Sequence, residues 1–232
     1  MLPIKDDQPR FSTPYINYFL IGLNLLIFLF EASLTPASLK AFISEFAIIP
    51  AHLSALLAGS SQYSPIAVVL PFFTSMFLHG SWMHVIGNMW FLYIFGDNVE
   101  DYLGHFNYLT FYLLTGLIAM SCQVAMDVHS RVPNLGASGA IAGVLGAYFV
   151  LYPRARVLTW LFVFVIYVPA WVILGYWFVL QFVSGTVTSL VYEGRSVGGG
   201  VAFWAHVGGF VAGLALIKIF PQRRRRYPYA IQ

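Results

Sequence analysis

The polar side chains that interrupt the apolar stretches of this sequence include His84, Asn88, Ser138 and His206. A serine hydroxyl attacks a carbonyl group only weakly until a base takes its proton, and histidine suits that role near neutral pH. Ser138 is therefore a candidate nucleophile, and His206 is its best-placed base. His84 and Asn88 share one face of an expected helix, about 6 Å apart along its axis, so they can point into one pocket.

Ser138 lies in a glycine-flanked turn, between Gly136 and Gly139, that leads into an apolar helix rich in small residues. Glycine allows the backbone to turn tightly at such a place. The N–H groups at the start of a helix have no partner within the helix, so they can stabilise the oxyanion that forms when a hydroxyl attacks a carbonyl. This segment thus offers a nucleophile and part of its oxyanion hole.

The helix of His206 and the helix that follows Ser138 both carry small residues at every fourth position. These residues are Ala205, Gly209 and Gly213 in the first helix and Gly139 and Gly143 in the second. Small faces let helices approach closely, and we expect the hydroxyl and the imidazole to reach a hydrogen-bond distance of about 2.6 to 3.2 Å. No aspartate is expected near His206, which predicts a Ser-His dyad rather than a triad.

The elements that position these residues must lie in a membrane. Of the 232 residues, 59% are apolar and only 9% are charged, and the mean hydropathy is +0.76. Soluble domains carry about a quarter charged residues and use polar surface to cover their cores. The composition therefore excludes soluble enzyme classes and predicts an all-α membrane protein, with residues 1–232 in a single domain.

Apolar runs bounded by proline, glycine or charged residues predict six transmembrane helices. The runs are 15–30, 82–95, 106–125, 139–152, 157–183 and 201–220. The second and fourth runs fall short of the roughly 20 residues that cross the hydrocarbon, so part of their depth is expected to be loop or to be supplied by flanking polar turns. Irregular backbone in a membrane is tolerated only where protein or a water-filled cavity covers it. Residues 34–81 are expected to form a long first outer loop that lies on the membrane.

The basic residues predict the orientation. If both ends are cytoplasmic, the inner side holds Lys5, Arg10, Arg154, Arg156, Lys218 and Arg223 to Arg226, and the outer side holds Lys40, Arg131 and Arg195. This asymmetry fits the positive-inside rule. It predicts a multi-pass protein of the plasma (inner) membrane, with short cytoplasmic tails at 1–14 and 221–232. The arginine cluster is interpreted as an anchor to lipid headgroups rather than as a nucleic-acid site.

Each of these features also has a plainer interpretation. Small-residue faces are ordinary contacts between membrane helices, and Ser138 could be one more small residue in such a face. His206 could be a buried histidine with a partner, and His84 with Asn88 a hydrogen-bonded pair between helices. The catalytic interpretation is favoured because the predicted topology brings all four to the outer side of the membrane. His79 lies at the same rim as a supporting or structural group.

Together these residues resemble the rhomboid family of intramembrane serine proteases. The matching features are a stretch with His79, His84 and Asn88, the motif Gly136-Ala-Ser138-Gly139, and the pair Ala205-His206 followed by Gly209 and Gly213. The six-helix layout extends the resemblance over most of the chain. The combination is specific, whereas each motif alone recurs by chance.

The resemblance implies a six-helix rhomboid-like bundle and the roles of its residues. In that family the serine of G-x-S-G is the nucleophile and the histidine of the sixth helix is the base, here Ser138 and His206. The histidine and asparagine of H-x-x-x-N line the oxyanion hole, here His84 and Asn88. The implied reaction is hydrolysis of a peptide bond in or beside a transmembrane segment of a membrane protein, through an acyl-enzyme and without a metal or cofactor.

Two positions depart from the family pattern. Many members carry a Trp-Arg pair in the first loop, and the stretch before Thr74 has neither residue. Some members carry a tyrosine one turn after the nucleophile that stacks on the catalytic histidine, and Ala142 stands at that place here. Trp204 and Phe203 are the candidates to support His206 instead. The four chemical residues are unaffected, so activity is expected.

Other functions are open alternatives. A catalytically silent rhomboid-like protein that binds transmembrane helices is disfavoured by the presence of Ser138 and His206. A channel or transporter is disfavoured because the sequence shows neither repeated halves nor intramembrane acids. A zinc protease is disfavoured because the sequence has no H-E-x-x-H. The aromatic fifth helix, with Gly175 as a bend, is interpreted as a lateral gate through which transmembrane substrates enter from the bilayer.

Overall fold

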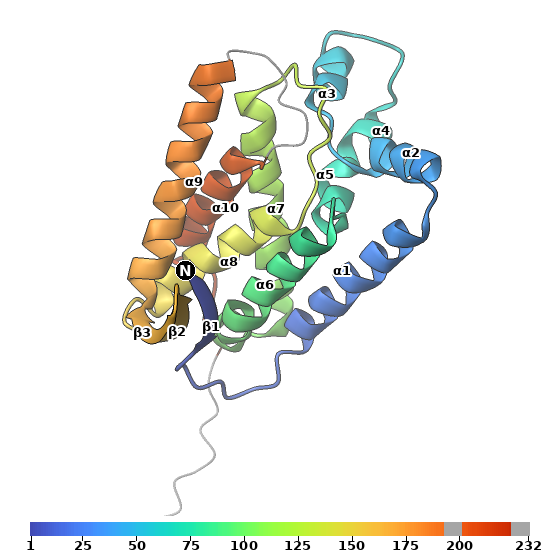
Figure 1. The fold of residues 1–232 in the computed structure, drawn as a ribbon. Coiled ribbons are helices and arrows are strands. Elements are labelled where there is room, and N and C mark those ends of the chain that lie inside the picture. The colour runs from blue at the N-terminus through green and yellow to red at the C-terminus, as the bar shows by residue number, and fades with distance from the viewer. Residues whose placement is uncertain (193–200, 224–232) are drawn as a thin grey trace, which may run out of the picture.

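The computed structural model describes residues 1–192 and 201–223, and it is mostly helical (Figure 1). Its elements in chain order are β1 (Leu2–Asp6), α1 (Tyr15–Ser33), α2 (Pro36–Phe46), α3 (Pro50–Leu57), α4 (Pro65–Val69), α5 (Pro71–Thr74), η1 (Ser75–Phe77), α6 (Trp82–Leu103), α7 (His105–Met126), α8 (Ser138–Leu151), β2 (Arg156–Leu161), β3 (Phe164–Pro169), α9 (Ala170–Tyr192) and α10 (Phe203–Leu216). Of the basic residues used to predict the orientation, Arg195 and Arg224 to Arg226 lie outside the described ranges.

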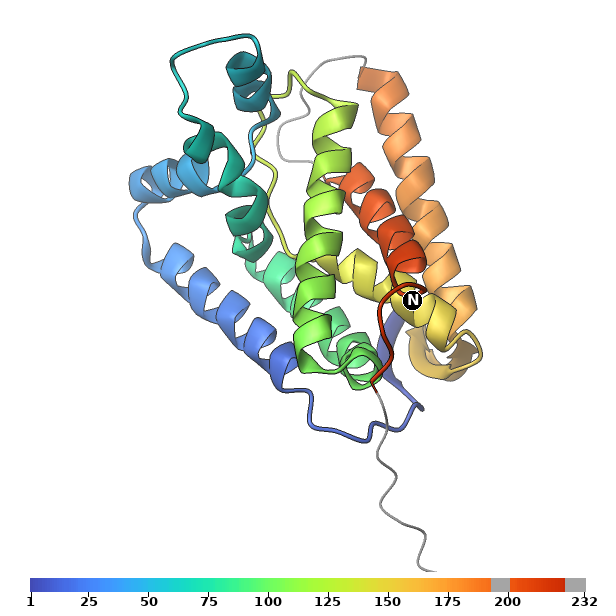
Figure 2. The same ribbon diagram turned by 180° about the vertical axis from the view of Figure 1, so that it is seen from behind.

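Helix α8 lies in the middle of the bundle, in contact with α6, α7, α9 and α10 (Figures 1 and 2). Residues 139–148 of α8 are all buried, and many of them are glycine or alanine. Because these residues add little width, the neighbouring helices pack close to the α8 backbone. A Cβ atom on Gly146 would stand only 2.2 Å from the carbonyl oxygen of Phe210 in α10. The helix that begins at Ser138 is thus the packing centre of the fold.

Local signals set both ends of α6, the helix that carries His84 and Asn88. The hydroxyl oxygen of Ser81 caps its start by accepting a hydrogen bond from the backbone N–H of His84 at 3.2 Å. Gly104, with φ of +78°, ends the helix, and α7 begins at the next residue. Glycine adopts this backbone conformation without the steric cost that a side chain brings. Both ends of α6 are therefore encoded locally.

The structure corrects the length expected for the second helix. The apolar run 82–95 is only the first part of α6, which continues to Leu103. Its polar end finds partners at the start of α1, where the carboxylate of Glu100 accepts the N–H groups of Ile16 at 3.0 Å and Asn17 at 2.7 Å. Because N–H groups at a helix start lack partners within the helix, Glu100 satisfies two of them. The second helix is thus extended by flanking polar residues, which is one of the two outcomes expected for its short apolar run.

A small antiparallel sheet with the strand order β1-β2-β3 lies at one end of the bundle (Figure 1). Strands β2 and β3 form a hairpin over Arg156–Pro169, and α9 follows at Ala170. The single helix expected over 157–183 is therefore wrong, and so is a purely α-helical fold. Strand β1 pairs with β2, so residues 2–6 are a strand and not part of a free tail.

Side chains reinforce the pairing of β1 with the bundle. The carboxylate of Asp7 accepts the backbone N–H of Arg156 at 2.8 Å and its guanidinium at 2.9 Å. Asp6 accepts a hydrogen bond from the hydroxyl of Tyr148 at the far end of α8. Burial raises the pKa of Asp6, because removal from water disfavours the charged carboxylate. The first strand is thus held by the helix that begins at the candidate nucleophile.

The connection after α1 folds into the short helices α2 to α5 and the turn η1, at the end of the bundle opposite the sheet (Figure 1). Helices α2 to α5 each have a proline at one of their first two positions, where its fixed φ suits a helix start. An isolated β-bridge joins Ile48 to Asn134, so this connection also touches the loop before Ser138. The connection expected as a long outer loop over 34–81 is therefore largely helical.

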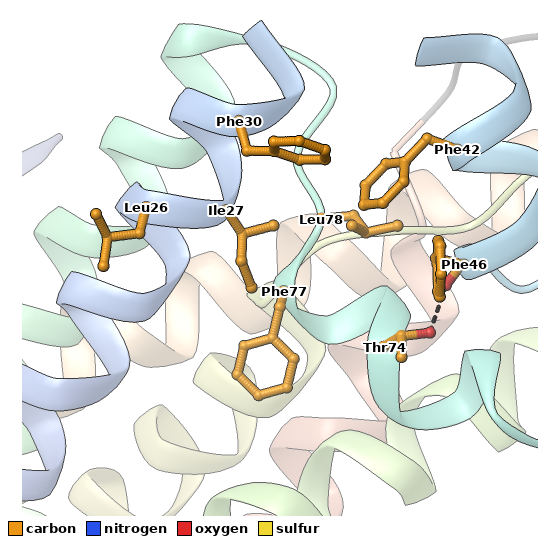
Figure 3. Close-up of a pocket in the computed structure, with 8 residues that line it drawn as sticks. All are labelled: Leu26, Ile27, Phe30, Phe42, Phe46, Thr74, Phe77 and Leu78. Atoms are coloured by element: carbon orange, nitrogen blue, oxygen red, sulfur yellow. Dashed lines mark hydrogen bonds between the residues drawn. The ribbon is translucent and has the colours of Figure 1, made fainter. Parts of the chain in front are cut away.

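An apolar pocket of about 330 Å³ lies between α1 and this connection (Figure 3). Phenylalanine rings from α1, α2 and η1 surround it, as do Leu26, Ile27, Thr74 and Leu78. The Thr74 hydroxyl donates a hydrogen bond to the carbonyl oxygen of Phe46 at 2.7 Å, so the polar group of the lining is already paired. The pocket lacks the chemistry-bearing residues of the sequence analysis.

Three helices, α1, α7 and α9, are long and apolar enough to cross a membrane. A further candidate is the pair Pro65–Phe77 and Trp82–Leu103, whose two parts meet at 75° as a broken span or a re-entrant loop. Helices α8 and α10 are apolar but have only 14 residues each. The described residues thus support a membrane protein with three or up to four spans by length, and the six-span layout stays a prediction.

Candidate active site

Ser138 is the first residue of α8, at the end of the loop that follows α7. The N–H group of Gly136 donates to the carbonyl oxygen of Ser75 at 2.8 Å and ties this loop to η1. The N–H of Ile141 bonds to the carbonyl oxygen of Ala137 at 3.0 Å, where the helical pattern begins. The N–H groups that precede this bond have no partner within the helix and face out of its start. The serine hydroxyl thus lies beside backbone donors.

The structure brings His206 of α10 to Ser138, with 2.8 Å between the imidazole Nε2 and the serine Oγ. Small residues make this approach possible. A Cβ atom on Gly209 would stand 2.1 Å from the carbonyl oxygen of Gly139, and one on Gly213 would stand 2.0 Å from that of Gly143. Real side chains cannot come so close, so α8 and α10 contact each other through their backbones. The candidate nucleophile and the candidate base are therefore held by the packing of these two helices.

The second ring nitrogen of His206 has a partner that the sequence analysis missed. The Gln181 side-chain oxygen, on α9, lies 2.7 Å from His206 Nδ1. A carbonyl oxygen only accepts hydrogen bonds, so Nδ1 carries the proton in this arrangement and Nε2 is left to accept the Ser138 hydroxyl. This is the tautomer that a general base requires. The signal in the sequence was a lone glutamine in a strongly apolar run.

The aromatic support of His206 also comes from α9. The Trp177 ring lies 5.6 Å from the imidazole centre to centre, with an interplanar angle of 37°. Trp204, which the sequence analysis named together with Phe203, instead donates from Nε1 to the Ser189 hydroxyl at 3.1 Å. Trp177 thus fills the role that the absence of a tyrosine at Ala142 left open.

His84 lies on the other side of the serine, against the loop backbone. A Cβ atom on Gly136 would stand 2.8 Å from His84 Cε1 and 3.6 Å from Ser138 Oγ. Gly136 also has φ of +127°, a conformation that side chains disfavour. The glycine before the serine is therefore required both for the turn and for the space that the imidazole occupies.

Asn88 follows His84 by one helical turn and is held by His79. Its Nδ2 lies 3.0 Å from His79 Nε2, and the backbone N–H of His79 donates to the Glu31 carboxylate of α1 at 3.1 Å. His79, Asn88 and Glu31 are all buried. The sequence predicts His79 only as a supporting or structural group and gives no sign of Glu31, whose partner is separated from it by 48 residues. A chain of contacts thus runs from α1 to the candidate oxyanion site.

The four candidate residues line one cavity of about 220 Å³. Its complete lining is Met83, His84, Gly87, Asn88, Phe91, Ser138, Ile141, Leu145, Trp177 and His206. Within the described ranges, no three histidine, cysteine, aspartate or glutamate side chains are grouped to hold a metal ion. The serine, the two histidines and the asparagine are the candidate chemical groups of this lining, and most of the other lining side chains are apolar.

The family model described as the rhomboid domain matches residues 67–223. The match covers more than half of the chain and includes all residues of the candidate site. The chain belongs to the rhomboid family. The resemblance to the rhomboid family is thereby confirmed, together with a mostly helical membrane fold.

Curated relatives match shorter stretches of this rhomboid chain. Rhomboid protein 1, mitochondrial, from Saccharomyces cerevisiae is 35% identical over 102 residues, which cover 42% of this chain and 29% of the relative. Rhomboid-like protein 11, chloroplastic, from Arabidopsis thaliana is 40% identical over 73 residues, which cover 32% of this chain and 26% of the relative. Presenilin-associated rhomboid-like protein, mitochondrial, from Bos taurus is 36% identical over 90 residues, which cover 37% of this chain and 23% of the relative. Each match spans less than a third of the relative's own length.

The names of these relatives refer to mitochondria and chloroplasts. They lend no support to the plasma membrane that the sequence analysis expected for this rhomboid chain. The apolar helices and the family together support a membrane protein.

Proposed function

We propose that this protein is a serine endopeptidase that cleaves transmembrane segments of other membrane proteins. The observation that carries the proposal is the 2.8 Å contact between Ser138 Oγ and His206 Nε2 at the start of a helix, inside a cavity that His84 and Asn88 also line. A nucleophile, a base and donors for an oxyanion are the parts that acyl transfer requires. Membership of the rhomboid family supports the same reaction.

The first half of the proposed reaction forms an acyl-enzyme. His206 Nε2 accepts the Ser138 proton as Oγ bonds to the carbonyl carbon of the scissile peptide. The carbonyl oxygen becomes an oxyanion, and the first N–H groups of α8 and the side chains of His84 and Asn88 donate to it. The C–N bond then breaks, His206 gives its proton to the leaving amine, and the acyl part of the substrate stays as an ester on Ser138.

The second half releases the acyl group by the same steps with water as the nucleophile. His206 Nε2 takes a proton from the water as its oxygen bonds to the ester carbon. The ester bond to Oγ breaks, Ser138 regains its proton from His206, and the carboxylic acid product leaves. Water must therefore reach the cavity in front of Ser138.

The proposed substrates are transmembrane helices that unwind at the cut. An α-helix hides its carbonyl groups in hydrogen bonds, so the scissile bond becomes accessible only after local unwinding. Large apolar side chains such as Met83, Phe91 and Trp177 wall a cavity of only about 220 Å³. Small residues at the cut are therefore expected to be preferred.

The proposed orientation places both termini in the cytoplasm and the active site near the outer side. Arg156 bonds to Asp7, and the N–H of Arg223 donates to the carbonyl oxygen of Tyr102, so these basic residues share the end of the bundle that holds the sheet. Lys40 lies in α2 at the opposite end (Figure 1). The positive-inside rule then supports a cytoplasmic sheet.

The direct test is labelling with a fluorophosphonate probe, which reacts with activated serines. Purified protein in detergent is compared with Ser138→Ala, His206→Ala and the control Ser121→Ala, whose serine bonds only within its own helix at Leu117. We expect label at Ser138, mapped by mass spectrometry, in wild type and Ser121→Ala only. Cleavage of a model transmembrane substrate should follow the same pattern. Folded wild type that neither takes the label nor cuts would reject the protease and favour the silent helix-binding protein.

A further inference from the structure

The imidazole of His206 is supported by a helix other than its own. Gln181 and Trp177 lie four residues apart on α9, so they share one helix face. The amide oxygen of Gln181 reaches Nδ1 at 2.7 Å, and the indole lies against the ring at 5.6 Å between centres. The ring is thus fixed at its edge and on its face by neighbouring residues of one element.

We infer that Gln181 is a positioning residue of the active site, which holds His206 in the tautomer and orientation that the reaction needs. The inference rests on the proposed protease function and deepens it, because it replaces the dyad expected from the sequence with a Ser-His-Gln relay of contacts. Gln181 does not touch the substrate, since it lies behind the imidazole and outside the lining of the cavity.

The chemistry of the two ring nitrogens explains why an acceptor behind His206 matters. A neutral imidazole has one N–H group and one acceptor nitrogen, and they exchange when the tautomer changes. With the Gln181 oxygen at Nδ1, the proton is held there and Nε2 keeps its lone pair for Ser138. With that acceptor removed, the tautomer that carries its proton on Nε2 becomes populated. In that tautomer Nε2 cannot take the serine proton.

The groups around the imidazole leave this role to Gln181. On α6, His84 lies across the cavity, and on α8 the Ser138 hydroxyl already occupies Nε2. On α7, Gln123 accepts the backbone N–H of Ala205 at 3.1 Å, and Cys122 packs against Gly208. Among the residues that the structure describes, no carboxylate contacts the ring. A neutral amide therefore takes the place that an acid occupies in a triad.

Two substitutions at Gln181 separate its effect on the orientation of the His206 imidazole from its effect on packing. Gln181→Met keeps the length of the side chain and removes the amide oxygen, whereas Gln181→Glu restores an oxygen acceptor and adds negative charge. The matched control is Ser189→Ala, which breaks a different side-chain hydrogen bond between α9 and α10, the one from Trp204, without touching the imidazole. Thermal unfolding of all variants in detergent checks that each is folded.

The expected results differ for each variant when cleavage of a transmembrane model substrate is followed against pH. Gln181→Met should lower kcat by about 10- to 100-fold with little change in KM, because general-base catalysis weakens while binding is kept. Gln181→Glu should recover most of the activity and move the acid limb of the profile to higher pH by about one unit, because a carboxylate stabilises the protonated ring. Ser189→Ala should match wild type in kcat and in pH profile.

A spectroscopic measurement tests the inference without activity. Nitrogen-15 spectra of histidine-labelled protein distinguish a protonated Nδ1 from a protonated Nε2. Wild type should show His206 protonated at Nδ1, and Gln181→Met should show loss of that single state. Unchanged spectra in Gln181→Met, or equal losses of kcat in Gln181→Met and Ser189→Ala with the same pH profile, would overturn the inference. A wild type inert to the fluorophosphonate probe would instead reject the protease, and the spectra would still decide the role of Gln181.

Discussion

The imidazole of His84 rests against the backbone of Gly136, so closely that a Cβ atom there would stand 2.8 Å from the ring Cε1 and 2.9 Å from Nε2. The two residues come from elements that are far apart in the sequence, α6 and the loop before α8. Their contact sets the distance between His84 and the start of α8, where Ser138 lies. The glycine of this loop thus shapes the proposed oxyanion site as well as the turn.

Gly136→Ala is expected to reduce kcat by at least about tenfold, because the added methyl pushes His84 out of the position from which it donates to the oxyanion. The residue would also be strained at φ of +127°. Cleavage of a transmembrane model substrate measures the loss. The matched control is Gly22→Ala in α1, where a Cβ atom would meet nothing within 4 Å. Equal activity of the two variants would contradict the proposed role of His84.

Gly213→Ala is expected to destabilise the fold by about 1 to 3 kcal/mol, because α8 and α10 must separate to make room. The new Cβ atom would stand 2.0 Å from the carbonyl oxygen of Gly143 and 2.9 Å from its Cα atom. Thermal unfolding of the detergent-solubilised protein measures this change in the free energy of unfolding. Gly22→Ala should be neutral or slightly stabilising in the same assay, since alanine favours helices. A variant as stable as wild type would show that these helices do not depend on backbone contact.

Asn88→Ala is expected to lower kcat by about 100- to 1,000-fold with KM nearly unchanged, as for the loss of one oxyanion donor. The amide has two N–H hydrogens, and one bond to His79 leaves the other for the substrate. His79→Leu should give a smaller loss in kcat, because Asn88 is then present but unanchored. Asn107→Ala is the control, since Asn107 bonds to the carbonyl oxygen of Leu103 and lies outside the cavity. A full effect of Asn107→Ala would point to general loss of structure.

Cysteine labelling from the two sides of a membrane is expected to show that α2 and the residues that follow α10 lie on opposite sides. Lys40 and Gln222 are both exposed, so Lys40→Cys and Gln222→Cys should each react with a maleimide when it reaches them. In a Cys122→Ser background and intact bacterial cells, an impermeant maleimide should label Lys40→Cys directly and Gln222→Cys only after permeabilisation. The reverse pattern would invert the proposed orientation, and labelling of both would exclude it.

The main parts of the candidate site could be predicted because they depend on local sequence patterns. His84 and Asn88 share a helix face through the helical period, and the small residues around Ser138 and His206 make close approach possible wherever the helices meet. Gln181 and Trp177 could not be assigned in the same way. Their contact with His206 depends on how α9 is rotated against α10, which only tertiary packing determines.

The hairpin before α9 was missed for a different reason. Residues 157–183 are almost all apolar, and a run of this kind does not by itself distinguish a strand from a buried helix. The β-branched and aromatic residues of 157–168, such as Val165, Ile166 and Tyr167, were the signal for strands. A strand also needs a partner, and β1 lies at the other end of the chain. Local hydropathy holds no information about that pairing.

The pairing of β1 with β2 has a consequence for the order in which the protein is assembled. Asp7 and Arg156, which bond beside the sheet, are 149 residues apart in sequence. During synthesis the first strand leaves the ribosome long before its partner exists, so it stays unpaired while α1, α6, α7 and α8 are synthesised. Contacts between such distant residues form late, because the intervening chain must first be ordered. The sheet therefore joins β1 to the bundle only after most of the helices have been synthesised.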